Sequence, residues 1–166
     1  TLRADTLARK GENMNIKDYT LKVVYEYAGK TRVINDSDDI LTFVDKGDDT
    51  HVHIIVNAKE AVKITLAELI YDRYFESEEW FYGGGYQSWS TSREYKRGDR
   101  QYGLRFPCNI IPLARTFAAA SGDTYFTEYG KDLYHSNTYT YLRKGADVEF
   151  FGTLNDRTGY TVFYAD

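Results

Sequence analysis

The residues best suited to molecular recognition are the two tryptophans of the chain, Trp80 and Trp89, which lie within ten residues of each other. Glycines and tyrosines separate them, and Trp89 follows a glutamine and a serine. Aromatic rings can cover the C–H faces of a sugar while amides and hydroxyls bond its hydroxyl groups. The segment therefore indicates a carbohydrate-binding surface made by Trp80, Tyr86, Gln87, Ser88 and Trp89. A buried aromatic corner, used only for packing, is the alternative.

Histidines and aspartates are the next candidates for ligand binding. His51 and His53 are two positions apart and would share one face of a strand, as paired metal ligands can, but no third ligand has a fixed position. The aspartates around Ile40–Val44 lack the glycine and the later glutamate of an EF-hand calcium loop. We expect half-exposed strand residues and solvated turns here, with no metal and no cofactor. The aspartates in question are Asp36, Asp38, Asp39, Asp45, Asp48 and Asp49.

Motifs for covalent or phosphate chemistry are incomplete. Ser88 and Ser90 are not framed as GxSxG, and the Gly83–Gly85 run continues to a serine where GxGxxG needs glycine. Cys108 and His135 could form a thiol–imidazole pair, but a lone cysteine is more often a small buried hydrophobe. The basic residues between positions 93 and 105 indicate a solvated loop or a docking surface for an acidic partner. We predict no catalytic residue in this chain.

Alternating apolar and polar residues predict that strands position these side chains. Residues 60–75 also fit a helix, but the β-branched Val62, Ile64 and Thr65 favour a strand. One helix is expected over Phe106–Ala120, with Pro107 and Pro112 near its start and Ser121-Gly122 after its end. Between aspartate turns lies a short apolar run, Ile40–Val44. The expected strands are Tyr19–Tyr27, Thr31–Ile34, Val52–Val56, Val62–Leu66, Asn137–Arg143, Asp147–Leu154 and Tyr160–Tyr164. We expect the last three to be sequential antiparallel neighbours.

This pattern predicts an all-β protein, an antiparallel β-sandwich with one short helix. The sequence of 166 residues gives one domain over residues 14–166. Residues 1–13 contain no aromatic side chain and precede the only methionine, so we interpret them as a leader that is added or disordered. Tyrosine, phenylalanine and tryptophan make up 16% of the chain, which suits half-buried strands and wet binding surfaces.

Charge and cysteine content exclude several classes of protein. A net charge of −4 argues against general nucleic-acid binding, which needs a basic surface. One cysteine excludes a disulfide framework and any CxxC motif. No apolar run approaches the roughly 18 residues of a membrane helix. We therefore expect a cytoplasmic protein without nucleic-acid or membrane partners.

The segment Tyr82–Glu94 resembles a signature in the amino-terminal domain of family 36 glycoside hydrolases, the α-galactosidase (melibiase) group. Its core is the run Gly85-Tyr86-Gln87-Ser88-Trp89-Ser90, which Gly84 precedes where the family has asparagine. Three later stretches are similar to the same domain: Leu133–Ser136, Tyr139–Arg143 and Gly152–Phe163. The similarity covers residues 15–166.

This resemblance implies a galactose-mutarotase-like β-supersandwich that packs on a carboxy-terminal catalytic (β/α)₈ barrel. Such a domain shapes the sugar-binding end of the active site, takes part in oligomer contacts and places Gln87, Ser88 and Trp89 near an α-galactoside. The family's nucleophile motif, K-x-D-x-N, does not occur in this chain, nor do alternating strands and helices. The resemblance thus implies a non-catalytic domain of a retaining α-galactosidase-type enzyme. An independent carbohydrate-binding module and a purely structural or oligomerisation sandwich are the alternatives.

Overall fold

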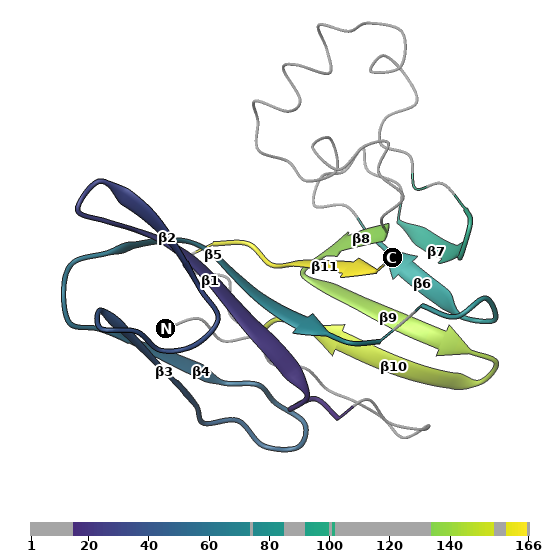
Figure 1. Cartoon of the computed structure of the whole chain (residues 1–166). Coiled ribbons are helices and arrows are strands. Elements are labelled where there is room, and N and C mark those ends of the chain that lie inside the picture. The colour runs from purple at the N-terminus through teal and green to yellow at the C-terminus, as the bar shows by residue number, and fades with distance from the viewer. Residues whose placement is uncertain are drawn as a thin grey trace, which may run out of the picture.

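A computed structural model describes residues 15–73, 75–84, 92–99, 101, 134–154 and 159–165. These residues form antiparallel sheets, which confirms the predicted all-β fold (Figure 1). The strands are β1 Tyr19–Tyr27, β2 Lys30–Ile34, β3 Leu41–Asp45, β4 Ile54–Ala58, β5 Lys63–Tyr71, β6 Trp80–Gly83, β7 Arg93–Lys96, β8 Tyr134–Asn137, β9 Tyr139–Lys144, β10 Asp147–Gly152 and β11 Val162–Ala165. In the described part of the chain, no helix has the length and apolarity needed to span a membrane. The leader and the predicted helix Phe106–Ala120 lie outside the described residues.

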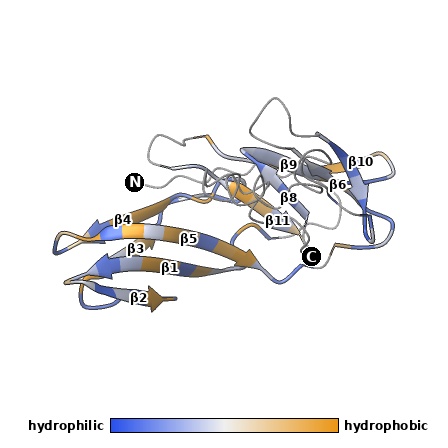
Figure 2. Ribbon diagram, turned by 90° about the horizontal axis from the view of Figure 1, so that it is seen from above, coloured by the Kyte–Doolittle hydropathy of each residue, from blue (hydrophilic) through white to orange (hydrophobic). Residues whose placement is uncertain are grey.

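The first half of the fold is a sandwich of two layers. A three-stranded sheet has the order β2-β1-β5, and the hairpin of β3 and β4 forms a second sheet. Apolar and polar bands alternate along β1 and β5 (Figure 2), as a sheet with one buried face requires. The strand prediction for residues 60–75 is confirmed, because Lys63–Tyr71 pairs along the length of β1.

A tight turn joins β1 to β2 at Ala28 and Gly29. Both residues have positive φ angles, 49° and 71°, as the two central residues of a type I′ turn do. This turn fixes the register in which Tyr27 faces Lys30 and Val23 faces Ile34. The predicted hairpin is therefore confirmed.

The core of this half lies between the two layers. Val23 and Tyr25 of β1 are buried against Ile40 and Leu41, and a second buried group formed by Ile16, Val52 and Ile54 continues it. The odd-numbered residues of β1 thus face the β3–β4 hairpin, as the alternation of apolar and polar residues along this strand predicts.

The second half of the fold is a four-stranded sheet with a two-stranded sheet beside it. The orders are β10-β9-β6-β7 and β11-β8. Their shared core is aromatic: Phe75, Phe81, Tyr95 and Tyr134 are buried together, and Phe75 meets Tyr134 edge to face at 5.3 Å between ring centroids.

One prediction for the end of the chain is wrong. A single strand was expected over Asn137–Arg143, but the chain breaks at Thr138, whose φ angle is +71°. Residues before Thr138 form β8, which pairs with β11, and residues after it form β9, which pairs with β10. β9 and β10 are sequential antiparallel neighbours, as expected, but β11 does not pair with β10 and returns to the sheet of β8. Two backbone hydrogen bonds stabilise this conformation of Thr138: its N–H donates to the Thr161 carbonyl, and its carbonyl accepts the Thr153 N–H.

Asp38 organises the turn that leads into β3. Its carboxylate accepts hydrogen bonds from the backbone N–H groups of Ile40 and Leu41, at 2.9 and 2.6 Å, and from the hydroxyl of the buried Tyr25. The Leu41 N–H and the Tyr25 hydroxyl hold the pKa of Asp38 below its ordinary value. The predicted aspartate turn is thus also an anchor for the core.

The strained backbone at Thr138 gives a first prediction. Threonine is β-branched and unfavourable at positive φ, whereas asparagine tolerates this conformation. We expect Thr138→Asn to raise the free energy of unfolding by about 0.5–1 kcal/mol, and the melting temperature by about 2 °C. Thr31→Asn, at an exposed position of β2, is the matched control and should be neutral or slightly destabilising. A lower melting temperature for Thr138→Asn would contradict the strain argument.

The Asp38 network gives a second prediction. A carboxyl whose pKa is lowered by folding stabilises the folded state above its unfolded pKa of about 3.9, and this contribution is lost as the pH falls through the folded pKa. We expect urea unfolding to show a steeper loss of stability below pH 4 in the parent chain than in Asp38→Asn, which is less stable at neutral pH. Asp49→Asn, at an exposed turn outside this network, should keep the parent's slope; an equal slope in Asp38→Asn would refute the assignment.

Candidate functional site

The outward face of the four-stranded sheet carries the candidate site. Trp80 and Tyr82 alternate with the buried Phe81 along β6, so both point away from the aromatic core. In register, Tyr82 faces Glu94 of β7, and Trp80 lies between Lys96 of β7 and Arg143 of β9. Side chains from three strands, β6, β7 and β9, therefore meet on this face.

Four aromatic rings form a continuous stack across this face. Tyr82 lies between Tyr141 and Tyr139, with ring centroids 5.0 and 5.4 Å away and planes tilted by 17° and 12°. Tyr139 in turn stacks on Phe150 of β10 at 5.8 Å. Tyr139 is 42% exposed and Phe150 is 38% exposed, so the stack meets solvent. We call these four residues the tyrosine ladder.

The ladder presents hydroxyl groups as well as ring edges. The hydroxyls of Tyr82 and Tyr139 are 3.2 Å apart, and this hydrogen bond, followed by burial, raises the pKa of Tyr139. Tyr141 donates to Glu94 at 3.1 Å. Burial and the bond to that carboxylate raise the pKa of Tyr141. Both groups thus remain neutral donors and acceptors near pH 7.

Charged side chains frame Trp80 beside the ladder. Lys96 and Arg143 approach its ring at 4.6 and 5.4 Å from the centroid. Arg143 also holds Glu94 through two hydrogen bonds of 2.7 and 2.6 Å, which lowers the pKa of Glu94. Trp80 is therefore fixed by cations, and a ligand that stacks on its ring has to share the ring with them.

The end of β6 is held against β8 by its glycines. The Gly84 N–H donates to the Ser136 hydroxyl at 2.9 Å, and the Gly84 carbonyl accepts the Asn137 N–H at 2.9 Å. The Gln101 amide donates to the His135 carbonyl and accepts the His135 N–H, both at 2.7 Å. These bonds fix the backbone at Gly84, the residue that follows β6.

Of the predicted carbohydrate-binding residues, Trp80 lies on this face. Tyr86, Gln87, Ser88 and Trp89 lie outside the described residues, as does Cys108.

Sequence reasoning missed the tyrosine ladder as a site. It assigned Tyr139 and Tyr141 to a strand, where period-two spacing already placed them on one face. Their contact with Tyr82 depends on the pairing of β6 with β9, which no local pattern in either strand indicates.

Three of the other candidate side chains, those of His51, Arg93 and Arg97, have structural partners. His51 contacts the Asp48 carboxylate at 3.0 Å and the Thr50 hydroxyl at 2.7 Å. Within the described residues, no cluster of three or more histidine, cysteine or acidic side chains could hold a metal ion. In the basic cluster, Arg93 lies over Tyr95 and Arg97 donates to the Phe75 carbonyl, so both serve packing within the described fold.

Comparison of the chain with protein families, with curated proteins and with solved structures finds no match.

The packing at Gly83 gives a third prediction. A Cβ atom there would lie 2.6 Å from the Gln101 amide nitrogen and 2.7 Å from the buried Tyr95 ring, and neither neighbour is free to move. We expect Gly83→Ala to lower the free energy of unfolding by about 1–3 kcal/mol in urea titrations. Gly159→Ala is the matched control, because nothing lies within 4 Å of its Cβ position. Equal stability of the two variants would show that β6 does not need this close approach.

Proposed function

We propose that this chain is a sugar-binding, non-catalytic β-sandwich domain of an α-galactosidase-like glycoside hydrolase. Its partners are then α-galactosides and the catalytic barrel of the same enzyme, onto which the sandwich would pack. The resemblance of Tyr82–Glu94 to the family signature supports this proposal, and the antiparallel β-sandwich fold is compatible with it. The single cysteine favours the reducing environment of the cytoplasm.

The observation that carries the proposal is the position of β6. This strand places Trp80 and Tyr82 on an exposed aromatic face, and its end is fixed to β8 where the signature segment begins. A sugar site needs aromatic surface beside hydrogen-bonding groups whose orientation is set in advance. The tyrosine ladder supplies ring edges and hydroxyls, and the hydrogen bonds of Gly84 fix the backbone three positions before Gln87 in the sequence.

The chemistry of this face supports binding rather than hydrolysis. A retaining glycosidase needs two carboxyl groups about 5–5.5 Å apart, one of which must hold a proton. Glu94 is the carboxylate of this face among the described residues, and two hydrogen bonds from Arg143 keep it ionised. It is thus unsuited to act as the general acid.

Sugar titration tests the proposed function. We expect galactose and melibiose to change the tryptophan fluorescence of the chain, with dissociation constants on the order of millimolar. Tyr139→Ala should weaken binding at least about tenfold, or about 1.4 kcal/mol, because it opens the ladder. Tyr27→Ala, in the first half of the fold, is the control. An α-galactoside with a chromogenic leaving group should not be hydrolysed.

Two outcomes would contradict this proposal. Equal affinity of Tyr139→Ala and Tyr27→Ala would remove the tyrosine ladder from the site. Absence of any fluorescence change up to about 100 mM galactose, well above a millimolar dissociation constant, would exclude a sugar site in the chain by itself.

A further inference from the structure

The edge of β1 is covered by β2 along only part of its length. β1 pairs with β5 from Tyr19 to Glu26, but its pairing with β2 ends at Val23 and Ile34. Among the described residues, no other strand pairs with this side of β1. The stretch from Tyr19 to Lys22 is thus an open strand edge.

The register shows which main-chain groups face this edge. A two-residue turn makes its flanking pair, Tyr27 and Lys30, a hydrogen-bonded pair, and such pairs recur at every second residue. Val23 is therefore the last residue of β1 whose N–H and C=O meet β2. By the same alternation, the main-chain groups of Leu21 and Tyr19 point to the open edge.

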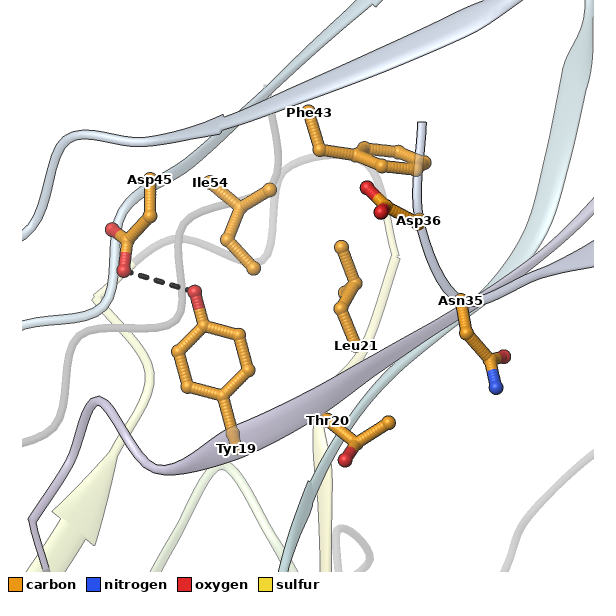
Figure 3. Close-up of a pocket in the computed structure, with 8 residues that line it drawn as sticks. All are labelled: Tyr19, Thr20, Leu21, Asn35, Asp36, Phe43, Asp45 and Ile54. Atoms are coloured by element: carbon orange, nitrogen blue, oxygen red, sulfur yellow. Dashed lines mark hydrogen bonds between the residues drawn. The ribbon is translucent and has the colours of Figure 1, made fainter. Parts of the chain in front are cut away.

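A cavity of about 390 Å³ lies beside this edge. It forms where the chain leaves β2 at Asn35 and turns toward β3, so it occupies the position that a longer β2 would fill. Figure 3 shows Leu21 and Ile54 at its centre, Phe43 and Asp36 on one side, and Tyr19 bonded to Asp45 on the other. The floor is apolar and the rim carries carboxylates.

The two carboxylates of the rim differ in their partners. Asp45 accepts hydrogen bonds from Lys17, Tyr19 and the backbone N–H groups of Gly47 and His53, so its charge is compensated. Asp36 accepts a hydrogen bond from the backbone N–H of Ser37 at 2.7 Å. None of the residues that line the cavity is basic. The cavity therefore has a net negative charge beside the Phe43 ring, which suits a cation.

We propose that this edge binds an extended peptide that adds a strand antiparallel to β1 and places one lysine or arginine in the cavity. The peptide backbone would bond Leu21 and Tyr19, as in other cases of strand addition to an open sheet edge. The stem of the basic side chain would cover Leu21 and Phe43, and its cation would reach Asp36. This inference does not depend on the proposed sugar-binding function, because the tyrosine ladder lies in the other half of the fold.

Three labelled peptides test the proposal by fluorescence anisotropy. The first is an acetylated and amidated pentapeptide in which a central lysine is flanked by valines and then threonines. The second has norleucine in place of lysine, which keeps the stem without the charge. The third has the backbone nitrogen of the central lysine methylated, so that the residue whose side chain enters the cavity cannot donate to the strand edge. We expect the first to bind and the other two to bind at least tenfold more weakly.

A pair of variants and amide exchange complete the test. Asp36→Lys should weaken binding of the lysine peptide at least tenfold, whereas Asp49→Lys makes the same charge change outside the cavity and should have no effect. Both aspartates are exposed, so neither change disturbs the core. The amide protons of Leu21 and Tyr19 should become protected from hydrogen exchange when the peptide binds.

Several results would overturn the proposal. They are binding that N-methylation leaves unchanged, equal effects of the two aspartate variants, or protection confined to other strands. A concentration-dependent dimer that protects Leu21 without peptide would assign the edge to a second copy of the chain instead. Failure of the lysine peptide to bind at about 1 mM, where even a free energy of −4 kcal/mol gives half saturation, would exclude the site.

Discussion

The contact between the end of β6 and the edge of β8 is the constraint on which the second half of the fold depends. Gly83 and Gly84 allow the backbones of β6 and β8 to approach closely. The Gly84 N–H then donates to the Ser136 hydroxyl, and the Asn137 N–H donates to the Gly84 carbonyl. Any side chain at Gly83 would collide with the side chains of Gln101 and Tyr95 and displace them. The aromatic core on one side of β6 and the tyrosine ladder on the other both follow from this approach.

The tyrosine content of the chain has two different physical uses. In the core, Tyr95 and Tyr134 are buried, and the Tyr134 hydroxyl shares its proton between the carbonyl of Lys96, which ends β7, and that of Asp99 in the turn after it. On the outward face, Tyr82 and Tyr139 keep their hydroxyls near solvent and bond each other. A ring with a polar tip can serve in both places because its apolar body packs while its hydroxyl finds a partner.

The strands of the first half could be predicted because their signals are local. Alternation along Tyr19–Tyr27 and the Ala28–Gly29 turn specify a hairpin within sixteen residues, and β-branched residues decided between strand and helix for β5. The break at Thr138 could not be predicted, because threonine favours strands and disfavours positive φ. Backbone hydrogen bonds from distant residues overrule that preference.

The candidate site could be predicted only in part, for a similar reason. Trp80 was found from the composition of its own segment. The tyrosine ladder needs the pairing of β6 with β9, two strands whose facing residues are more than fifty positions apart. Non-local pairing of this kind is set by packing of the whole sheet and leaves no pattern within either strand.

Gln101 shows how a strand edge can be closed without another strand. Its amide offers one donor and one acceptor, as a peptide unit does, and both are used by His135. The adjacent Asn137 N–H donates to Gly84, so these main-chain groups on the side of β8 opposite β11 are not open to a foreign strand. Gln101 thereby protects this edge of β8 from edge-to-edge pairing. Its deamidation to glutamate would place two oxygens face to face, so slow chemical ageing at this one side chain would undo that protection.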